Sequence, residues 1–287
     1  MKMILNKIND YSVFSIQYKT LKENIENICT NCLLPGKIIR DAIEKKDTYY
    51  QKIPEGLLIF IDEGNQYSVF YFLDQSKPFP ILTSNKLLLI EELDSENRRK
   101  EYLEQQTKKL KDAGFKLAAY NYQFQINLAE QKQLIQNEFL SASNKLNNAG
   151  FTSSCNLTNY QIDQVINLWK SSLRPTDIPY DHLNFNTQSN QYVVCVLDQM
   201  KNVCGTLWWT YKGNICEIRH IVTRPDCYRK GISNYTMLYS FLRAMETGSK
   251  IVVSYVDKEN NKSIFMHLKA GMKKNGKISL QFINENI

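Results

Sequence analysis

The sequence contains few of the residues from which metal and disulfide sites are built. It has three histidines, and its seven cysteines include a single C-x-x-C pair, Cys29 and Cys32. A structural zinc site usually needs a second such pair or nearby histidines. An odd number of cysteines is also not typical of a disulfide framework. We therefore expect no bound metal, and thiols that are buried or unreactive.

Long apolar runs are missing as well. No stretch of eighteen apolar residues occurs, and the N-terminal residues contain no apolar run long enough for a secretory signal. We therefore expect a cytoplasmic protein without a membrane partner. The net charge of +7 fits general solubility or an anionic cofactor. No lysine- or arginine-rich block is interleaved with aromatic residues, so nucleic acid is not an expected partner.

The second half of the chain alternates strand and helix signals. Thr158 and Gln161 form a capping box, which predicts a helix over residues 159–172. Alternating and β-branched runs predict strands over residues 192–197, 203–211, 215–223, 250–256 and 277–283. Helices are predicted over residues 231–246 and 260–270, each followed by a glycine.

The first half follows a similar order. Strands are predicted over residues 56–62, 67–74, 86–93 and 115–126, and helices over residues 95–113 and 128–149. Both halves thus run hairpin, strand, helix, strand, helix, and the second helices end alike, at Gly150 and Gly271. This predicts an internal duplication, with a boundary near residues 150–157 and one strand open to being shared or swapped.

The order of elements predicts an α/β (α+β) protein with two domains, over residues 1–151 and 152–287. Each domain is expected to hold a mixed, mostly antiparallel sheet flanked by helices.

A short basic turn joins the predicted strand 215–223 to the helix that follows. The turn reads Arg224-Pro225-Asp226-Cys227-Tyr228-Arg229-Lys230-Gly231-Ile232-Ser233. Free amides at a helix start bind phosphate, and Gly231 lets a ligand approach the backbone closely. Arg224, Arg229 and Lys230 add positive charge. The alternative is an ordinary strand-to-helix loop with a charged surface.

Two motifs in this half resemble the GNAT superfamily of acyl-CoA-dependent N-acetyltransferases. The family turn Q/R-x-x-G-x-G/A is matched by residues 228–233, except that Tyr228 and Ser233 replace its usual first and last residues. A second family pattern is N-x-x-A/S-I, followed by an aromatic residue that acts as general acid, then a lysine and Gly-Phe. Residues 260–272 match it in spacing. The resemblance covers about residues 152–287 and extends to the first half only as an order of elements.

The resemblance implies acetyl-CoA as co-substrate and no metal. In the family, the strand before the turn splays from its neighbour and the pantetheine arm adds in the gap. The cofactor-binding residues that this implies are Ile221, Val222, Thr223, Arg229, Lys230, Gly231, Ile232, Ser233, Asn234 and Asn260.

Two residues are expected to carry the proton transfers. Glu217 is the predicted base, acting through water, since some family members place a catalytic glutamate on this strand. His267 stands at the family's usual tyrosine and is the predicted acid for the CoA thiolate. The alternatives are a Glu217–Arg219 surface pair and a structural His267. Tyr255 and His220 are reserve candidates.

Strand alternation makes a further prediction about the residues near Glu217. Arg219, Ile221 and Thr223 should share its face, and His220 should point to the opposite face.

The expected function is transfer of an acetyl group from acetyl-CoA to a primary amine by direct attack. The acceptor is expected to be an amine-bearing small molecule, an amino acid or a peptide. The loop at residues 175–186 lies where the family recognises its acceptor, and the alternative is an ordinary irregular connection. Trp208 and Trp209 are read as core residues or as an acceptor wall. The first half lacks a glycine turn between Leu93 and Ser95 and is expected to be a degenerate copy.

Two rival functions remain at this stage. One is a Fem-type aminoacyl transferase, which would bind aminoacyl-tRNA with strong salt dependence. The other is a non-catalytic acyl-CoA-binding module.

Overall fold

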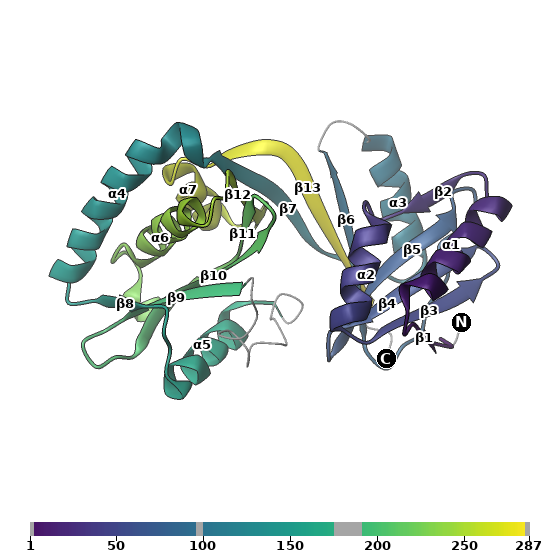
Figure 1. The fold of residues 1–287 in the computed structure, drawn as a ribbon, viewed down its shortest axis with the longest axis horizontal. Helices are drawn as coiled ribbons and strands as arrows, with labels where there is room; N and C mark the ends of the chain where they lie inside the picture. The colour runs from purple at the N-terminus through teal and green to yellow at the C-terminus, as the bar shows by residue number, and fades with distance from the viewer. Residues whose placement is uncertain (1–2, 96–99, 175–190, 285–287) are drawn as a thin grey trace. The chain divides into compact units, whose positions relative to one another are not determined.

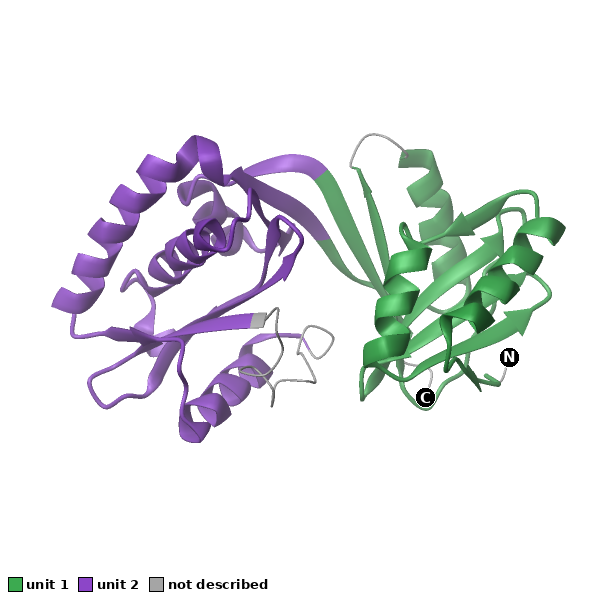
Figure 2. Ribbon diagram, viewed as in Figure 1, with its two compact units in different colours: residues 1–120, 277–287 green, residues 121–276 purple. Residues whose placement is uncertain are grey.

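The computed structural model describes residues 3–95, 100–174 and 191–284. Two compact units are present (Figures 1 and 2). Unit 1 comprises residues 1–120 and 277–287, and unit 2 comprises residues 121–276. Among the described residues, no helix is long and apolar enough to cross a membrane.

Unit 1 is a mixed sheet with helices packed on it. Its helices are α1 (Tyr11–Asn24), α2 (Pro35–Lys45) and α3 (Lys100–Asp112). Its strands are β1 (Asn6–Lys7), β2 (Ile28–Thr30), β3 (Thr48–Ile53), β4 (Gly56–Asp62), β5 (Gln66–Asp74), β6 (Leu87–Ser95) and parts of β7 (Lys116–Asn127) and β13 (Lys273–Asn284). The strand order includes β1-β3-β4-β5-β6-β13, with β2 on β5. Phe14 of α1 and Ile39 of α2 pack on Leu57, Ile59 and Phe72 of the sheet.

Unit 2 repeats this plan. Its helices are α4 (Leu128–Asn148), α5 (Asn159–Ser172), α6 (Ile232–Glu246) and α7 (Asn261–Lys269). Its strands run in the order β7, β12 (Ile251–Asp257), β11 (Ile215–Thr223), β10 (Val203–Lys212), β9 (Gln191–Leu197) and β8 (Thr152–Ser154). The capping box predicted for α5 is present.

The two faces of the unit 2 sheet bury different helices. Trp209 and Ile218 face α6, where they pack with Phe241. Trp208 and Val222 face α5, where the Trp208 ring lies tilted against that of Trp169, with ring centroids 5.8 Å apart. Both Trp208 and Trp209 are buried, which confirms that they are core residues.

The boundary between the units differs from the one expected at residue 151. The end of β7 pairs with β12, and α4 packs on α6 through Phe139 and Tyr235. The end of β13 pairs with β6. Strands β7 and β13 therefore each begin in one unit and end in the other, as their change of colour in Figure 2 shows. The strand exchange that the sequence left open is present.

The parallel strand pairs identify which elements of the two units correspond. Strands β5 and β6 are parallel in unit 1, and β11 and β12 are parallel in unit 2. Strand β6 therefore corresponds to β12, and not to β11 as the order of elements suggested. In unit 1 the position of the phosphate turn is segment 75–86, between β5 and β6, rather than the Leu93–Ser95 junction. That segment contains no glycine.

The same correspondence changes which helix end in unit 1 matches the one at Gly271. Helix α3 corresponds to α7, so Gly114 is the counterpart of Gly271, and Gly150 is not. Both glycines have a left-handed φ, +90° and +85°. Their amides bond the carbonyls of Lys111 and Leu268, each three residues back, at 3.0 Å. Such left-handed helix ends favour glycine.

Cys29 and Cys32 are buried, as expected for idle thiols. Burial raises the pKa of the Cys29 thiol and raises that of Cys32 to about 12. Neither thiol is therefore ionised at neutral pH, which a redox or metal-binding pair would require.

Candidate functional site

The basic turn of unit 2 is exposed from Tyr228 to Gly231. Gly231 precedes α6 with φ +80°, and a Cβ placed there meets no atom within 4 Å. In the described part of the chain, the backbone N–H groups of residues 229–234 donate to no protein acceptor. A row of unpaired amides at a helix start is an anion-binding arrangement.

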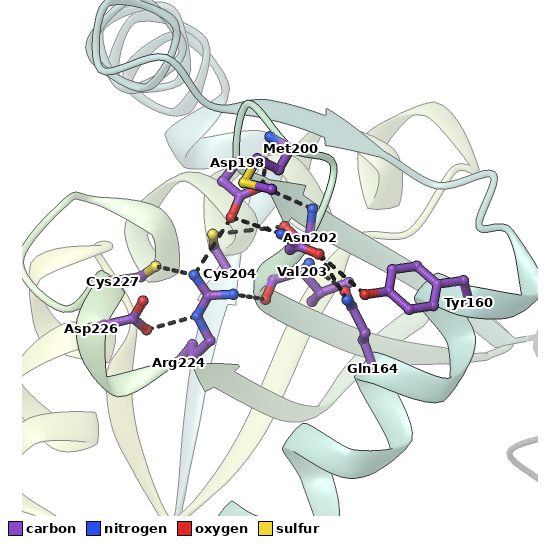
Figure 3. Close-up of polar contacts among 10 residues, drawn as sticks. All are labelled: Tyr160, Gln164, Asp198, Met200, Asn202, Val203, Cys204, Arg224, Asp226 and Cys227. Carbon is purple, nitrogen blue, oxygen red and sulfur yellow. Dashed lines mark hydrogen bonds and ion pairs between the residues drawn. The ribbon is translucent and has the colours of Figure 1, made fainter.

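Arg224 is partly exposed and holds this turn in place through a set of polar contacts (Figure 3). Its guanidinium pairs with Asp226 at 2.7 Å and with Asp198 at 3.6 Å, and it donates to the Val203 carbonyl at 3.3 Å. Arg224 is therefore a scaffold residue, in contrast to the expectation that it would meet phosphate. Arg229 and Lys230 are the exposed cations of the turn.

Two contacts fix the turn against strands β10 and β11. The Thr223 and Ser233 hydroxyls lie 2.8 Å apart, which ties the end of β11 to the first turn of α6. Gly205 of β10 passes under α6, where a Cβ would come within 2.5 Å of the Ile232 side chain. A glycine inside a strand pattern signals such a close approach, and the sequence analysis missed this one.

Strand β11 separates from β12 next to the turn. Their parallel register covers four residue pairs, from Ile215 with Ile251 to Ile218 with Ser254. Beyond this point, β11 continues to Thr223 alongside β10, and β12 continues to Asp257 alongside β7. The splay that the resemblance implied is therefore present in this fold, directly before the free amides.

A β-bulge at Arg219 corrects the predicted faces of β11. Trp208 pairs with His220 and Trp209 pairs with Ile218, so Arg219 has no Cα partner on β10. A bulge adds one residue and shifts the alternation. Ile221 consequently packs on the α6 side with Ile218.

His220 lies on the α5 side as a result. Its ring centroid is 5.3 Å from that of Trp208, and Glu217 is on the same face because its partner Thr210 is two residues from Trp208. The prediction that His220 and Glu217 point apart was wrong, and so was the placing of Ile221 and Thr223 with Glu217.

Glu217 is a buried carboxylate held by two cations. Its side chain is 11% exposed, and it pairs with Arg219 at 2.5 Å and with Lys212 at 3.4 Å. Burial alone would raise the pKa of Glu217, but Arg219 and Lys212 outweigh it, and the pKa lies below its usual value. The carboxylate is therefore ionised at neutral pH, and the two cations that hold it also lower its basicity. Sequence reasoning did not anticipate Lys212.

His267 does not have the environment of a general acid. It is 2% exposed, its Nδ1 is 2.7 Å from the Ser263 carbonyl and its Nε2 is 3.0 Å from the Ser254 hydroxyl. A carbonyl only accepts, so the ring proton sits on Nδ1 and Nε2 accepts from Ser254. No ring proton is left for a thiolate. His267 links α7 to β12, which favours the structural alternative.

Burial also lowers the pKa of His267 to about 4. Since the unfolded value is about 6.5, neutral His267 contributes stability that is complete above pH 6.5 and is lost as the pH falls to 4. We expect a loss of about 3 kcal/mol over this window. Urea unfolding at pH 7 and pH 4 measures it, and His267→Gln should remove this part of the pH dependence. An unchanged dependence in the variant would contradict the assignment.

The remaining predicted residues have mixed surroundings. Asn260 caps α7, with its Oδ1 accepting from the Ser263 amide at 3.0 Å, so its side-chain oxygen serves the helix. Tyr255 follows the last β11–β12 pair, and its hydroxyl accepts from Gln123 at 2.6 Å. The predicted acceptor loop, residues 175–186, lies outside the described residues.

No family model matches the sequence, and no curated protein matches it. Solved structures do match. A tandem GNAT protein from the clavulanic acid biosynthesis pathway is similar over 99% of this chain and 98% of its own, with a TM-score of 0.60 and 10% identity. The chain has the fold of a tandem GNAT protein.

Further structures share the GNAT fold. A GCN5-related N-acetyltransferase from Kribbella flavida has a TM-score of 0.53 and 10% identity, covering 86% of this chain and 93% of its own. A GCN5-related glucosamine N-acetyltransferase region of a fungal multi-domain GH3 β-N-acetylglucosaminidase reaches 0.60 at 7% identity, over 97% of this chain and 38% of that one. The tandem GNAT fold thus agrees with the resemblance carried by residues 228–233 and 260–272.

Proposed function

We propose that the protein is an N-acetyltransferase that moves an acetyl group from acetyl-CoA to a primary amine by direct attack. The observation that carries this proposal is the row of free amides at residues 229–234. They follow the part of β11 that lies beyond its last pair with β12, Ile218 with Ser254. A nucleotide pyrophosphate is an acceptor that such a row fits. The acceptor is a small-molecule amine, an amino acid or a peptide.

The cofactor-binding residues have separate roles in this proposal. The backbone of residues 221–223 forms the β11 edge beyond the last pair with β12, which suits an extended pantetheine arm. The turn at residues 229–234 supplies N–H donors, and Arg229 and Lys230 supply positive charge. When bound, acetyl-CoA supplies the thioester that is attacked.

Glu217 takes the proton of the attacking amine, directly or through water. Its ionised state and its place on the α5 face, beside Trp208 and His220, support this role. We assign the role of general acid to Tyr255 in place of His267. Tyr255 lies on β12, one residue beyond Ser254, where the pairing of β12 with β11 ends. A phenol hydroxyl can donate a proton to a departing thiolate.

The proposal is tested by thermal unfolding with CoA and by thiol release over a panel of amines. At a CoA concentration of 100 times Kd, binding should stabilise the protein by about 2.7 kcal/mol, which raises Tm by several degrees. Thiol release should then require both acetyl-CoA and an amine. No Tm shift with CoA contradicts the proposal. A shift without turnover on any amine favours an acyl-CoA-binding module instead.

A further inference from the structure

Unit 1 contains the same splayed strand pair as unit 2. Its parallel strands β5 and β6 are paired from Gln66 with Leu87 to Ser68 with Leu89, and their register then ends. Strand β5 nevertheless runs on to Asp74, with β4 paired along its other edge. The edge of β5 beyond Ser68 therefore corresponds to the edge of β11 beyond Ile218.

In unit 1 this edge is covered by the chain itself. Strand β2 pairs with it antiparallel, with Cys29 opposite Leu73 and Thr30 opposite Phe72. Because β4 occupies the other edge of β5, β2 lies on the side from which β6 has diverged. A short strand of the protein thus occupies the position in which an extended ligand would add to the sheet.

The side chain of Asn31 fills the rest of the space between β5 and β6, next to the point where their pairing ends. Its side chain is 6% exposed, and its Nδ2 donates to the Val69 carbonyl of β5 at 3.0 Å and to the Glu91 carbonyl of β6 at 3.3 Å. Its Oδ1 accepts from the Tyr71 amide at 2.9 Å. One amide side chain therefore bonds backbone groups of both strands, and its bonds to Val69 and Tyr71 of β5 satisfy groups that are buried.

Asn31 meets β5 along the edge that corresponds to the edge of β11 beyond Ile218. Tyr71 lies three residues beyond the last pair of β5 with β6, and Ile221 lies three residues beyond the last pair of β11 with β12 when the bulged residue Arg219 is counted. Unit 1 also has no glycine in segment 75–86, where the phosphate turn would be.

We propose that residues 28–32 permanently occupy the acyl-CoA gap of unit 1, so that unit 1 binds no acyl-CoA and the chain takes up one equivalent. The identity of the excluded ligand rests on the proposed function of unit 2. The conclusion that β2 and Asn31 fill the gap does not depend on that function.

Residue-resolved amide hydrogen exchange and calorimetric titration with CoA test this inference together. The Tyr71 amide should exchange slowly without ligand and should not change with CoA, whereas the amides of residues 229–234 should become slower. Titration should give one equivalent. Asn31→Ala should speed exchange at Tyr71 at least tenfold. The matched control is Asn24→Ala, since Asn24 is exposed and its Nδ2 donates to the Thr20 carbonyl within its own helix.

The outcomes separate the two proposals. Rapid exchange at Tyr71 without ligand, added protection there with CoA, or two equivalents bound would overturn the filled gap. No protection at residues 229–234 and no binding heat would overturn the proposed function, while the Tyr71 rates in the wild type and in Asn31→Ala still decide whether the gap is filled.

Discussion

Glu217→Gln should lower kcat by about 10²- to 10⁴-fold, the usual contribution of a positioned general base. Glutamine keeps the size of the side chain and a carbonyl that can accept from Arg219, but it cannot take up a proton. The KM for acetyl-CoA should change little, because Glu217 lies on the α5 face and not in the turn at residues 229–234. Steady-state thiol release with a saturating amine measures both constants.

Two further variants distinguish a base from a structural ion pair. Arg219→Met removes the larger of the two attractions that keep the pKa of Glu217 low. Burial should then raise that pKa, and the acid limb of the kcat/KM profile should move towards neutral pH. Glu246→Gln is the matched control, since Glu246 is exposed and pairs with Arg243 on its own helix. A wild-type rate in Glu217→Gln would remove Glu217 as the base.

The sequence predicts most elements of unit 2 because local signals agree there with the fold. Strand β11 and helix α5 have the predicted bounds, and α6 begins one residue later than predicted, after Gly231. The alternating pattern of β11 correctly placed Arg219 beside Glu217, but it gave the wrong faces for His220, Ile221 and Thr223. A bulge is set by pairing with β10, and the residues around Arg219 carry no local mark of it.

The strand exchange and the filled gap depend on contacts between distant residues. Strand β13 pairs with β6, from Lys277 with Ser95 to Asn284 with Leu88, and Asn31 bonds Val69 and Glu91. Local propensity contains no information about such pairing, and the first 55 residues gave no assigned element. Among the site residues, the turn was readable from its motif, whereas the burial that makes His267 structural was not.

Gly231→Asp should weaken CoA binding by about 100-fold, which corresponds to about 2.7 kcal/mol. The left-handed φ of +80° is one that aspartate tolerates better than most residues. The new carboxylate would stand among the free amides, compete for them, and repel a pyrophosphate at the start of α6. Calorimetric titration with CoA measures the change in Kd.

Gly248→Asp is a control for the same substitution at the other end of α6. Gly248 has a φ of +78°, and a Cβ there also meets no atom within 4 Å, so both variants introduce the same side chain into open space with the same backbone conformation. A carboxylate is favourable at the N-terminal end of a helix and unfavourable at its C-terminal end, so Gly248→Asp should have the lower Tm. Only Gly231→Asp should nevertheless lose CoA affinity, and equal affinity in both variants would mean that the amides of residues 229–234 do not hold the pyrophosphate.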